Sequence, residues 1–151
     1  MKGIYLAIVV AISALLLMPV SSASISQTFT DDTNDVMNMM YENSTINAPN
    51  VDISKITYYQ SGKSVVITLE VVGNIGGKSI YDVAIETAAE SNESSKYYEI
   101  AYIEDPLLAE EMNYTVGGTV INDSGKKIPS HFSVQEGKKL RISFDYDVPA
   151  E

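Results

Sequence analysis

Four oxygen-bearing side chains lie close together near the start of the chain: Asp31, Asp32, Asn34 and Asp35. Carboxylate and amide oxygens are the hard ligands that Ca²⁺ prefers, so this spacing indicates a calcium site within one turn. Asp52 is the nearest further residue that could supply a ligand. The spacing differs from that of an EF-hand loop, which needs a central glycine and a distal glutamate. The alternative interpretation is a solvated acidic turn that caps a short helix.

The chain has ten tyrosines and no tryptophan, so tyrosine supplies most of its aromatic surface. Two pairs of tyrosines are adjacent in strand-like segments, and neighbours on a strand point to opposite faces. An outward-facing tyrosine can stack on a sugar ring or anchor a protein interface. The residues that we expect to include ligand-binding side chains are Tyr58, Tyr59, Tyr97 and Tyr98. The alternative is that they pack in the core or at its rim.

Constellations that could carry out catalysis are missing from the sequence. His131 is the only histidine, and a single histidine on a strand is more often structural or exposed than a base or a haem ligand. Glu110 and Glu111 are adjacent, whereas general acid–base catalysis needs carboxylates that face each other across a cleft. No nucleophile elbow, glycine-rich phosphate loop or HExxH motif occurs. We therefore expect a protein without enzymatic activity.

Four Asn-x-Ser/Thr sequons begin at Asn43, Asn92, Asn113 and Asn122. They lie in polar, turn-like stretches of the chain, so N-glycosylation of these four asparagines is one prediction. Chance occurrence is the alternative, because the chain is rich in asparagine, serine and threonine.

The elements that must hold these residues are β-strands, and the clearest pattern is a hairpin in residues 51–73. Its second half alternates apolar with more polar residues, as a strand with one face on a core does. That apolar set is Val65, Ile67, Leu69 and Val71. The turn is expected at residues 60–63, because Gly62 suits tight-turn geometry. On the first strand, Ser54, Ile56 and Tyr58 are expected to share a face.

Further alternating segments follow at short intervals, with polar turns between them. Residues 36–41 are expected to form an apolar plug over one end of the core, because methionine fills irregular gaps; the alternative is a short helical turn capped by Asp32 or Thr33. A single turn or a loop is expected in residues 104–112, and a turn in residues 122–129. Together these patterns predict an all-β fold, a single antiparallel β-sandwich of about eight strands. The expected strands are residues 24–29, the two strands of the hairpin, 79–88, 97–103, 113–121 with an interruption at Gly117-Gly118, 130–135 and 139–146.

The first 23 residues have the pattern of a secretory signal peptide. Lys2 precedes an apolar run from Ile4 to Val20, and the small residues Ser21 and Ala23 occupy the positions that a signal peptidase reads. We predict cleavage after Ala23, which leaves residues 24–151 as one domain that is secreted or at the cell surface. The alternative is an uncleaved membrane anchor, for which the run is at the short limit.

The chain carries 20 acidic and 10 basic residues, a net charge of −10, and no cysteine. A field of this sign repels polyanions, so nucleic acid and anionic membrane surfaces are poor partners. A membrane contact is expected only through an uncleaved signal segment. Without disulfides, an exported domain must be held together by its core, by a metal or by neighbours in an assembly.

The order of motifs resembles a known superfamily. An acidic turn at residues 31–36 follows the first strand, residues 50–53 (NVDI) lead into the hairpin, and residues 67–73 read ITLEVVG before a strand that begins YYEI at residue 97. This order is similar to secreted archaeal and bacterial domains of the superfamily that holds family 9 carbohydrate-binding modules and DOMON domains. The resemblance implies a β-sandwich that binds sugars or, in some members, haem. The chain departs from it in having no tryptophan to clamp a sugar.

These patterns predict an exported, non-enzymatic binding or interaction module at the cell surface. Its expected partner is carbohydrate or another cell-envelope protein, and Ca²⁺ is the one cofactor that the sequence suggests. The alternative is a structural subunit of a surface layer or filament. In that case, self-association would occur when residues 24–29 complete a neighbour's sheet by strand addition.

Overall fold

The structure is a computed structural model that describes residues 24–36, 45–86 and 96–146. Within these ranges the protein has nine strands and one short helix. The predicted signal peptide, most of the expected apolar plug, and the sequons at Asn43 and Asn92 lie outside the described residues. The elements are β1 (Ile25–Thr30), β2 (Ile53–Ser61), β3 (Ser64–Val71), β4 (Ile80–Glu86), β5 (Tyr97–Ile103), α1 (Pro106–Glu111), β6 (Gly117–Asn122), β7 (Lys127–Ile128), β8 (Ser130–Gln135) and β9 (Lys139–Asp145).

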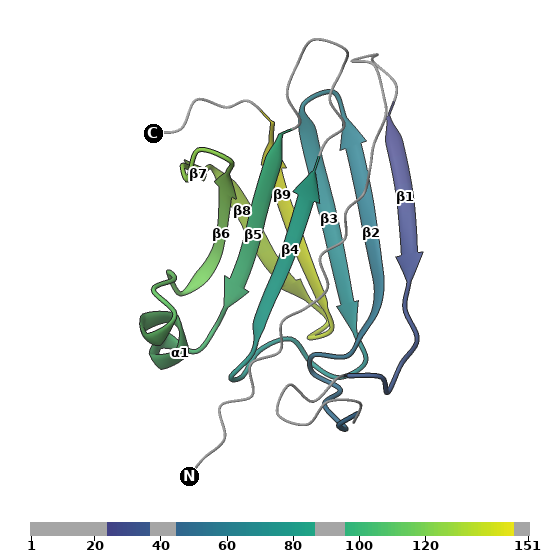
Figure 1. Cartoon of the computed structure of the whole chain (residues 1–151). Helices are drawn as coiled ribbons and strands as arrows, with labels where there is room; N and C mark the ends of the chain where they lie inside the picture. Colours follow the sequence, from purple (N-terminus) through teal and green to yellow (C-terminus); the bar gives the residue numbers. More distant parts are fainter. Residues whose placement is uncertain (1–23, 37–44, 87–95, 147–151) are drawn as a thin grey trace.

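The strands form two antiparallel sheets that pack face to face (Figure 1). The five-stranded sheet has the order β1-β2-β3-β9-β8, and the four-stranded sheet has the order β4-β5-β6-β7. The chain crosses between the sheets twice, from β3 to β4 and from β7 to β8. The predicted all-β sandwich is therefore confirmed, with nine strands in the described part of the chain instead of about eight.

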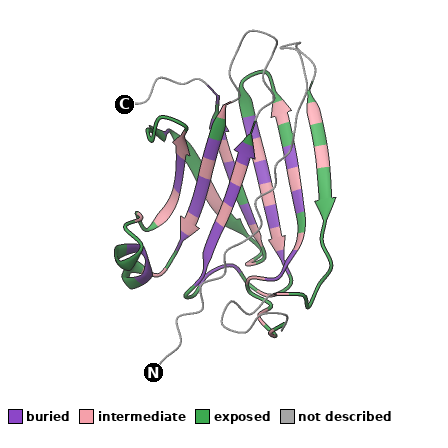
Figure 2. Ribbon diagram, viewed as in Figure 1, coloured by how far each residue is buried: buried purple, intermediate pink, exposed green. Residues whose placement is uncertain are grey.

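One hydrophobic core lies between the two sheets and takes side chains from both. The apolar face predicted for β3 is buried throughout, since Val65, Ile67, Leu69 and Val71 are each exposed by 2% or less. Figure 2 shows the resulting alternation of buried and half-buried residues along the central strands. A register slip of one residue would move this whole set to solvent, at roughly 1.5–3 kcal/mol for each side chain. Burial of one face therefore sets the strand register.

The central hairpin forms where the sequence predicts it. Ser61 pairs with Ser64, which leaves Gly62 and Lys63 as a two-residue turn. Gly62 has a φ of 59°, a left-handed conformation that glycine adopts without a Cβ clash. The two-residue turn and the burial of alternate side chains therefore both favour the same β2–β3 register.

The expected position of Ser54 is wrong because β2 contains an irregularity near its start. The pairing with β3 shifts between Ile53 and Lys55, as in a β-bulge, which reverses the side-chain alternation. Ile53 is consequently in the core at 6% exposure. The Ser54 hydroxyl instead donates a hydrogen bond to the Glu70 carbonyl at 3.2 Å.

Two strand boundaries also differ from the sequence-based expectation. The strand expected from residue 113 begins only at Gly117, because Asn113 has a left-handed backbone (φ 58°) that does not fit a strand. The interruption expected at Gly117-Gly118 does not occur, since both glycines pair with β5 in a regular register. The turn expected in residues 122–129 contains the short strand β7, in which Ile128 pairs with Val120. Alternation of apolar and polar residues predicts neither feature, because both depend on local turn geometry.

The helix α1 is short, as the sequence predicts for this segment, and its start is well capped. The Asp105 carboxylate accepts the backbone N–H of Leu108 at 2.9 Å, and Pro106 occupies the start of the helix, where proline is tolerated. Leu108 and Ala109 pack with Ile80 and Ile103 against the outer side of the four-stranded sheet. The helix therefore covers only one end of that outer face.

The first strand lies at the edge of the sandwich. β1 pairs with β2 alone, and Figure 1 shows it beyond the four-stranded sheet. Phe29 lies opposite the buried Ile56, so it faces the core side. Phe29 nevertheless remains 36% exposed, because the second sheet does not extend over this edge.

Candidate functional site

The four tyrosines predicted to bind ligand do not form one site. Tyr58 and Tyr98 are 4% and 3% exposed and lie in the core, where a surface ligand does not reach them. Tyr59 and Tyr97 are both 42% exposed. Tyr59 lies on the outer face of the five-stranded sheet, whereas Tyr97 lies on the outer face of the four-stranded sheet. One ligand of modest size therefore contacts only one of them.

The buried tyrosines have a structural role at one end of the core. The hydroxyls of Tyr58 and Tyr146 lie 2.7 Å apart, and the Tyr58 hydroxyl also donates to Oε1 of Gln60 at 2.8 Å. The Tyr98 ring packs 5.0 Å from that of Tyr146 and 5.5 Å from that of Phe144. Because Tyr98 comes from the other sheet, this group links the two sheets.

The side chains best placed to bind a ligand surround Tyr97. Tyr97 and Glu99 alternate on the outer side of β5, and Asp82 and Glu86 alternate on the outer side of β4. The strand register places Glu86 opposite Tyr97 and Asp82 opposite Ala101. We call Asp82, Glu86, Tyr97 and Glu99 the acidic tyrosine cluster. It lies on the part of the sheet face that α1 does not cover.

The electrostatics of the acidic tyrosine cluster favour the arrival of a donor or a positive charge. Burial raises the pKa of Asp82, and the nearby Glu99 carboxylate raises it further. Burial, Glu99, Asp82 and Glu86 raise the pKa of Tyr97. The Oδ1 atom of Asp82 is inaccessible to solvent and has no hydrogen-bond partner among the described residues. A group that donates hydrogen bonds to the carboxylates of Glu86 and Glu99, or that brings a positive charge beside them, would therefore relieve this repulsion.

Tyr114 positions one carboxylate of the cluster from the side. Its hydroxyl donates a hydrogen bond to Oε1 of Glu99 at 2.9 Å. This hydrogen bond, followed by burial, raises the pKa of Tyr114 to about 12. Tyr114 also packs against the small hydrophobic cluster under α1. The helix and the loop after it therefore hold Glu99 in place.

Sequence reasoning missed the carboxylates of the cluster and found only Tyr97. The alternation of β4 does place Asp82 and Glu86 on one face, and that of β5 places Tyr97 and Glu99 on one face. The missing information was the pairing of these strands, which brings both sets to the same side of one sheet. A single sequence does not specify which strands are neighbours across a loop of this length.

The acidic turn near the N-terminus is exposed at all four predicted calcium ligands, Asp31, Asp32, Asn34 and Asp35. The Asn34 N–H donates to Oδ2 of Asp52 at 2.7 Å, and Asp52 is only 3% exposed. Asp52 therefore holds the turn, which it approaches from the start of β2. Within the described ranges, no three histidine, cysteine, aspartate or glutamate side chains gather to hold a metal ion. The Ca²⁺ site stays a prediction without support from this geometry.

The remaining candidate residues lie apart from the acidic tyrosine cluster. His131 is exposed on β8, opposite Ser143 on the outer side of the five-stranded sheet. Asn113 is exposed in the loop after α1. The Asn122 side-chain oxygen accepts the backbone N–H groups of Ser124 and Lys126 at 3.1 and 3.0 Å, so this side chain shapes the β6–β7 turn. Glycosylation of both asparagines stays a prediction.

No helix in residues 24–36, 45–86 or 96–146 has the length and apolar character needed to cross a membrane. The chain matches no family model, and no curated protein or solved structure shows significant similarity to it. The resemblance to the superfamily of family 9 carbohydrate-binding modules and DOMON domains therefore stays a prediction beyond the β-sandwich fold class.

Proposed function

We propose that the protein is an exported, non-enzymatic binding module at the cell surface and that the acidic tyrosine cluster is its ligand-binding site. The observation that carries this proposal is Tyr97, 42% exposed and beside three carboxylates on the part of the sheet face that α1 does not cover. The ligand is a carbohydrate or the polar side chains of another cell-envelope protein. The signal-peptide pattern of residues 1–23 supports export.

The chemistry of the cluster suits a ligand rich in hydroxyl groups. A tyrosine ring can pack against the C–H face of a sugar, and ionised carboxylates act only as hydrogen-bond acceptors. Exposed Glu86 and half-buried Glu99 offer such acceptors on the same face as Tyr97. The carboxylates lie side by side on a flat face, an arrangement for binding and not for acid–base catalysis across a cleft.

Thermal unfolding with a panel of soluble glycans tests this proposal. A ligand at one hundred times its Kd adds about 2.7 kcal/mol of stability, which raises the Tm by several degrees for a domain of this size. Tyr97→Ala is expected to abolish the shift. Tyr59→Ala is the matched control, because Tyr59 is equally exposed on the opposite face. A Tm shift that persists in Tyr97→Ala and disappears in Tyr59→Ala would contradict the proposal, because it would place the site on the five-stranded sheet.

A second candidate function, a structural subunit that assembles by strand addition, has support from β1. Phe29 faces the core side yet remains 36% exposed, and β1 is a sheet edge, which can template pairing with another chain. If a neighbour covers this edge, Phe29→Ser should lower the sedimentation-derived mass at high concentration. Equal masses for Phe29→Ser and the unmodified protein would reject assembly through this edge.

A further inference from the structure

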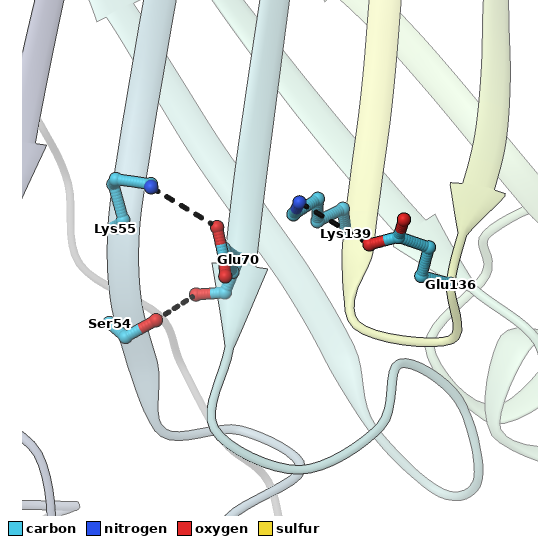
Figure 3. Close-up of polar contacts among 5 residues, drawn as sticks. All are labelled: Ser54, Lys55, Glu70, Glu136 and Lys139. Carbon is cyan, nitrogen blue, oxygen red and sulfur yellow. Dashed lines mark hydrogen bonds and ion pairs between the residues drawn. The ribbon is translucent and has the colours of Figure 1, made fainter.

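The carboxylates around the two sheets differ in whether a basic side chain neutralises them. Around the five-stranded sheet, Lys55 Nζ lies 3.4 Å from Glu70 Oε2, and Lys139 Nζ lies 3.4 Å from Glu136 Oε2 (Figure 3). On the four-stranded sheet, none of the three carboxylates of the acidic tyrosine cluster has a lysine or arginine partner among the described residues. The cluster therefore carries negative charge that no neighbouring basic side chain balances.

The pairing of β4 with β5 places a small side chain in the middle of the cluster. Glu86 lies opposite Tyr97, and Ala84, which is half-buried, lies opposite Glu99. The Cβ atoms of opposite residues are about 5 Å apart, and those of diagonal neighbours are at most about 7–8 Å apart. Because the Ala84 side chain ends at its Cβ atom, the longer side chains around it extend further from the sheet. A ligand group that lies over Ala84 is therefore within reach of one aromatic ring and two carboxylates.

The cluster is held in place in the free protein although its carboxylates repel one another. Glu99 is half-buried, and the Tyr114 hydroxyl donates a hydrogen bond to its Oε1 at 2.9 Å. Burial, and then the Glu99 carboxylate, raises the pKa of Asp82, which reflects this repulsion. Carboxylates that only keep a surface soluble extend into water, where repulsion is screened. A positive charge beside the half-buried carboxylates would offset the repulsion.

We propose that the ligand of the acidic tyrosine cluster is a glycan with free amino groups, and that one ammonium group lies over Ala84 between Glu86 and Glu99. This inference rests on the proposed function, because it names the chemical class of the ligand for the same site. An ammonium group donates charge-assisted hydrogen bonds to carboxylates, and the face of the Tyr97 ring attracts a positive charge.

An amino sugar uses both parts of the site, the aromatic ring and the carboxylates. Its C–H face covers the ring of Tyr97, whereas a lysine side chain offers only a narrow methylene chain. The net charge of −10 adds a long-range attraction for a cationic polymer. These features favour an amino sugar over a lysine of another protein.

Titration with two matched oligosaccharides tests the class of ligand. Glucosamine oligomers carry an amino group on every ring, and N-acetylglucosamine oligomers of equal length carry a neutral acetamide in its place. Protein purified after expression of the full sequence should bind the glucosamine oligomer about tenfold more tightly or better at low salt and mildly acidic pH, because its hydrogen bonds to carboxylates are charge-assisted. This preference should shrink as ionic strength rises.

Two variants test the position of the ammonium group. Glu86→Gln removes a charge from the cluster and should remove most of the preference, whereas Glu136→Gln removes an equal charge from the turn before β9 and should preserve it. Ala84→Lys places a tethered ammonium among the carboxylates. It should raise the Tm of the free protein and abolish binding of the glucosamine oligomer, whereas the uncharged Ala84→Gln should not raise the Tm.

Each result has a definite meaning for the inference. A preference for the glucosamine oligomer that Glu86→Gln and Ala84→Lys remove supports it. An equal Kd for the two oligomers overturns it, as does failure of the glucosamine oligomer to bind, or a preference that is as strong in Glu86→Gln as in Glu136→Gln. A neutral glycan whose binding depends on Tyr97 would overturn this inference and still support the proposed function, so the two failures are distinguishable. Circular dichroism of each variant establishes that it is folded.

Discussion

Asp82 shows that a carboxylate on the outer face of a sheet can destabilise the folded protein. It lies on the outer side of β4, yet its neighbours cover Oδ1 completely, and in the part of the chain that the structure describes no donor reaches that atom. Burial first, and then the Glu99 carboxylate, raises the pKa of Asp82 above its ordinary value of 3.8. Ionisation of Asp82 is therefore less favourable in the folded protein than in the unfolded chain. Polar groups held in this way are common at binding sites.

Replacing Asp82 with asparagine should stabilise the free protein at neutral pH. The folded protein retains the Asp82 proton to a higher pH than the unfolded chain does. Stability consequently falls as pH rises from the ordinary pKa of 3.8 through the raised pKa, and the loss persists at pH 7. Asp82→Asn removes this loss, so its Tm should exceed that of the unmodified protein at pH 7 and approach it at low pH. Glu110→Gln, in an exposed carboxylate of α1, is the control; a lower Tm for Asp82→Asn at pH 7 would contradict the assignment.

The buried hydroxyls of Tyr58 and Tyr146 predict sensitivity to alkali. Burial, and then the proximity of Tyr58, raises the pKa of Tyr146 above the ordinary value of 10.0, and burial raises the pKa of Tyr58. The stability that depends on these protonated hydroxyls is complete below pH 10 and is lost as pH rises through the raised values. Tyr146→Phe should cost about 1 kcal/mol at pH 7, the value of one hydrogen bond. It should also flatten the fall in stability above pH 10.

Urea unfolding at pH 7 and at several pH values above 10 measures both effects of Tyr146→Phe. Tyr102→Phe provides a comparison, because the pKa of Tyr102 is raised to about 12 by burial and by Glu104 at a more exposed position. If the alkaline slope is the same with and without the Tyr146 hydroxyl, the buried pair does not control this transition.

Among the elements, β6 and β8 meet at a corner where a glycine is required. A Cβ added to Gly118 would overlap the ring of Phe132. That ring stacks on Tyr102 with a centroid distance of 5.9 Å and an interplanar angle of 18°. Gly118→Ala is therefore expected to destabilise the protein by about 1–3 kcal/mol, as overpacking does. Chemical denaturation measures the loss.

A double-mutant cycle shows whether the clash with Phe132 is the cause. In a Phe132→Ala background the ring is absent, so Gly118→Ala should cost much less than it does in the unmodified protein. An equal cost in both backgrounds would assign the effect to the backbone of β6 and not to this contact.

The centre and one edge of the five-stranded sheet should differ in local stability. β3 lies between β2 and β9 and buries every second side chain, whereas β1 is an edge strand with only half-buried or exposed residues. Amide hydrogen exchange should be about a hundredfold faster or more in β1 than in β3. This ratio corresponds to a difference of about 3 kcal/mol in opening free energy. Protection of β1 amides equal to that of β3 would indicate that another surface covers this edge.

The strands and their faces could be predicted where burial alone decides the pattern. The alternation of β3 and β9 is regular, and the residues predicted to face inward are buried. The bulge after Ile53, the left-handed break before Gly117 and the two-residue β7 could not be predicted, because local backbone geometry decides them. The acidic tyrosine cluster was predicted only at Tyr97, since its other members depend on which strands become neighbours.

At the scale of the whole molecule, loops at one end connect the two sheets. The Tyr81 hydroxyl, from β4, donates to the carbonyl of Asn50 at 2.6 Å, and it accepts the Gly76 N–H at 3.2 Å. The Asn50 side chain accepts the Asn74 N–H at 2.9 Å. The segment before β2 is thus bonded to the crossover between the sheets. At the other end, the Tyr98–Tyr146 contact provides a second link between them.

These links and the shared core predict that the two sheets unfold as one cooperative unit. The core contains buried residues of both sheets without a division between them, so separation of the sheets would expose apolar surface on each. Calorimetry should show a single transition with an enthalpy of about 70 kcal/mol for every 100 residues that unfold. Far-ultraviolet circular dichroism, which follows strands, and the near-ultraviolet signal of buried tyrosines should have the same midpoint. Different midpoints for the two signals would mean that the sheets separate before their strands unfold. The tyrosine contacts would then be too weak to make the two sheets unfold as one unit.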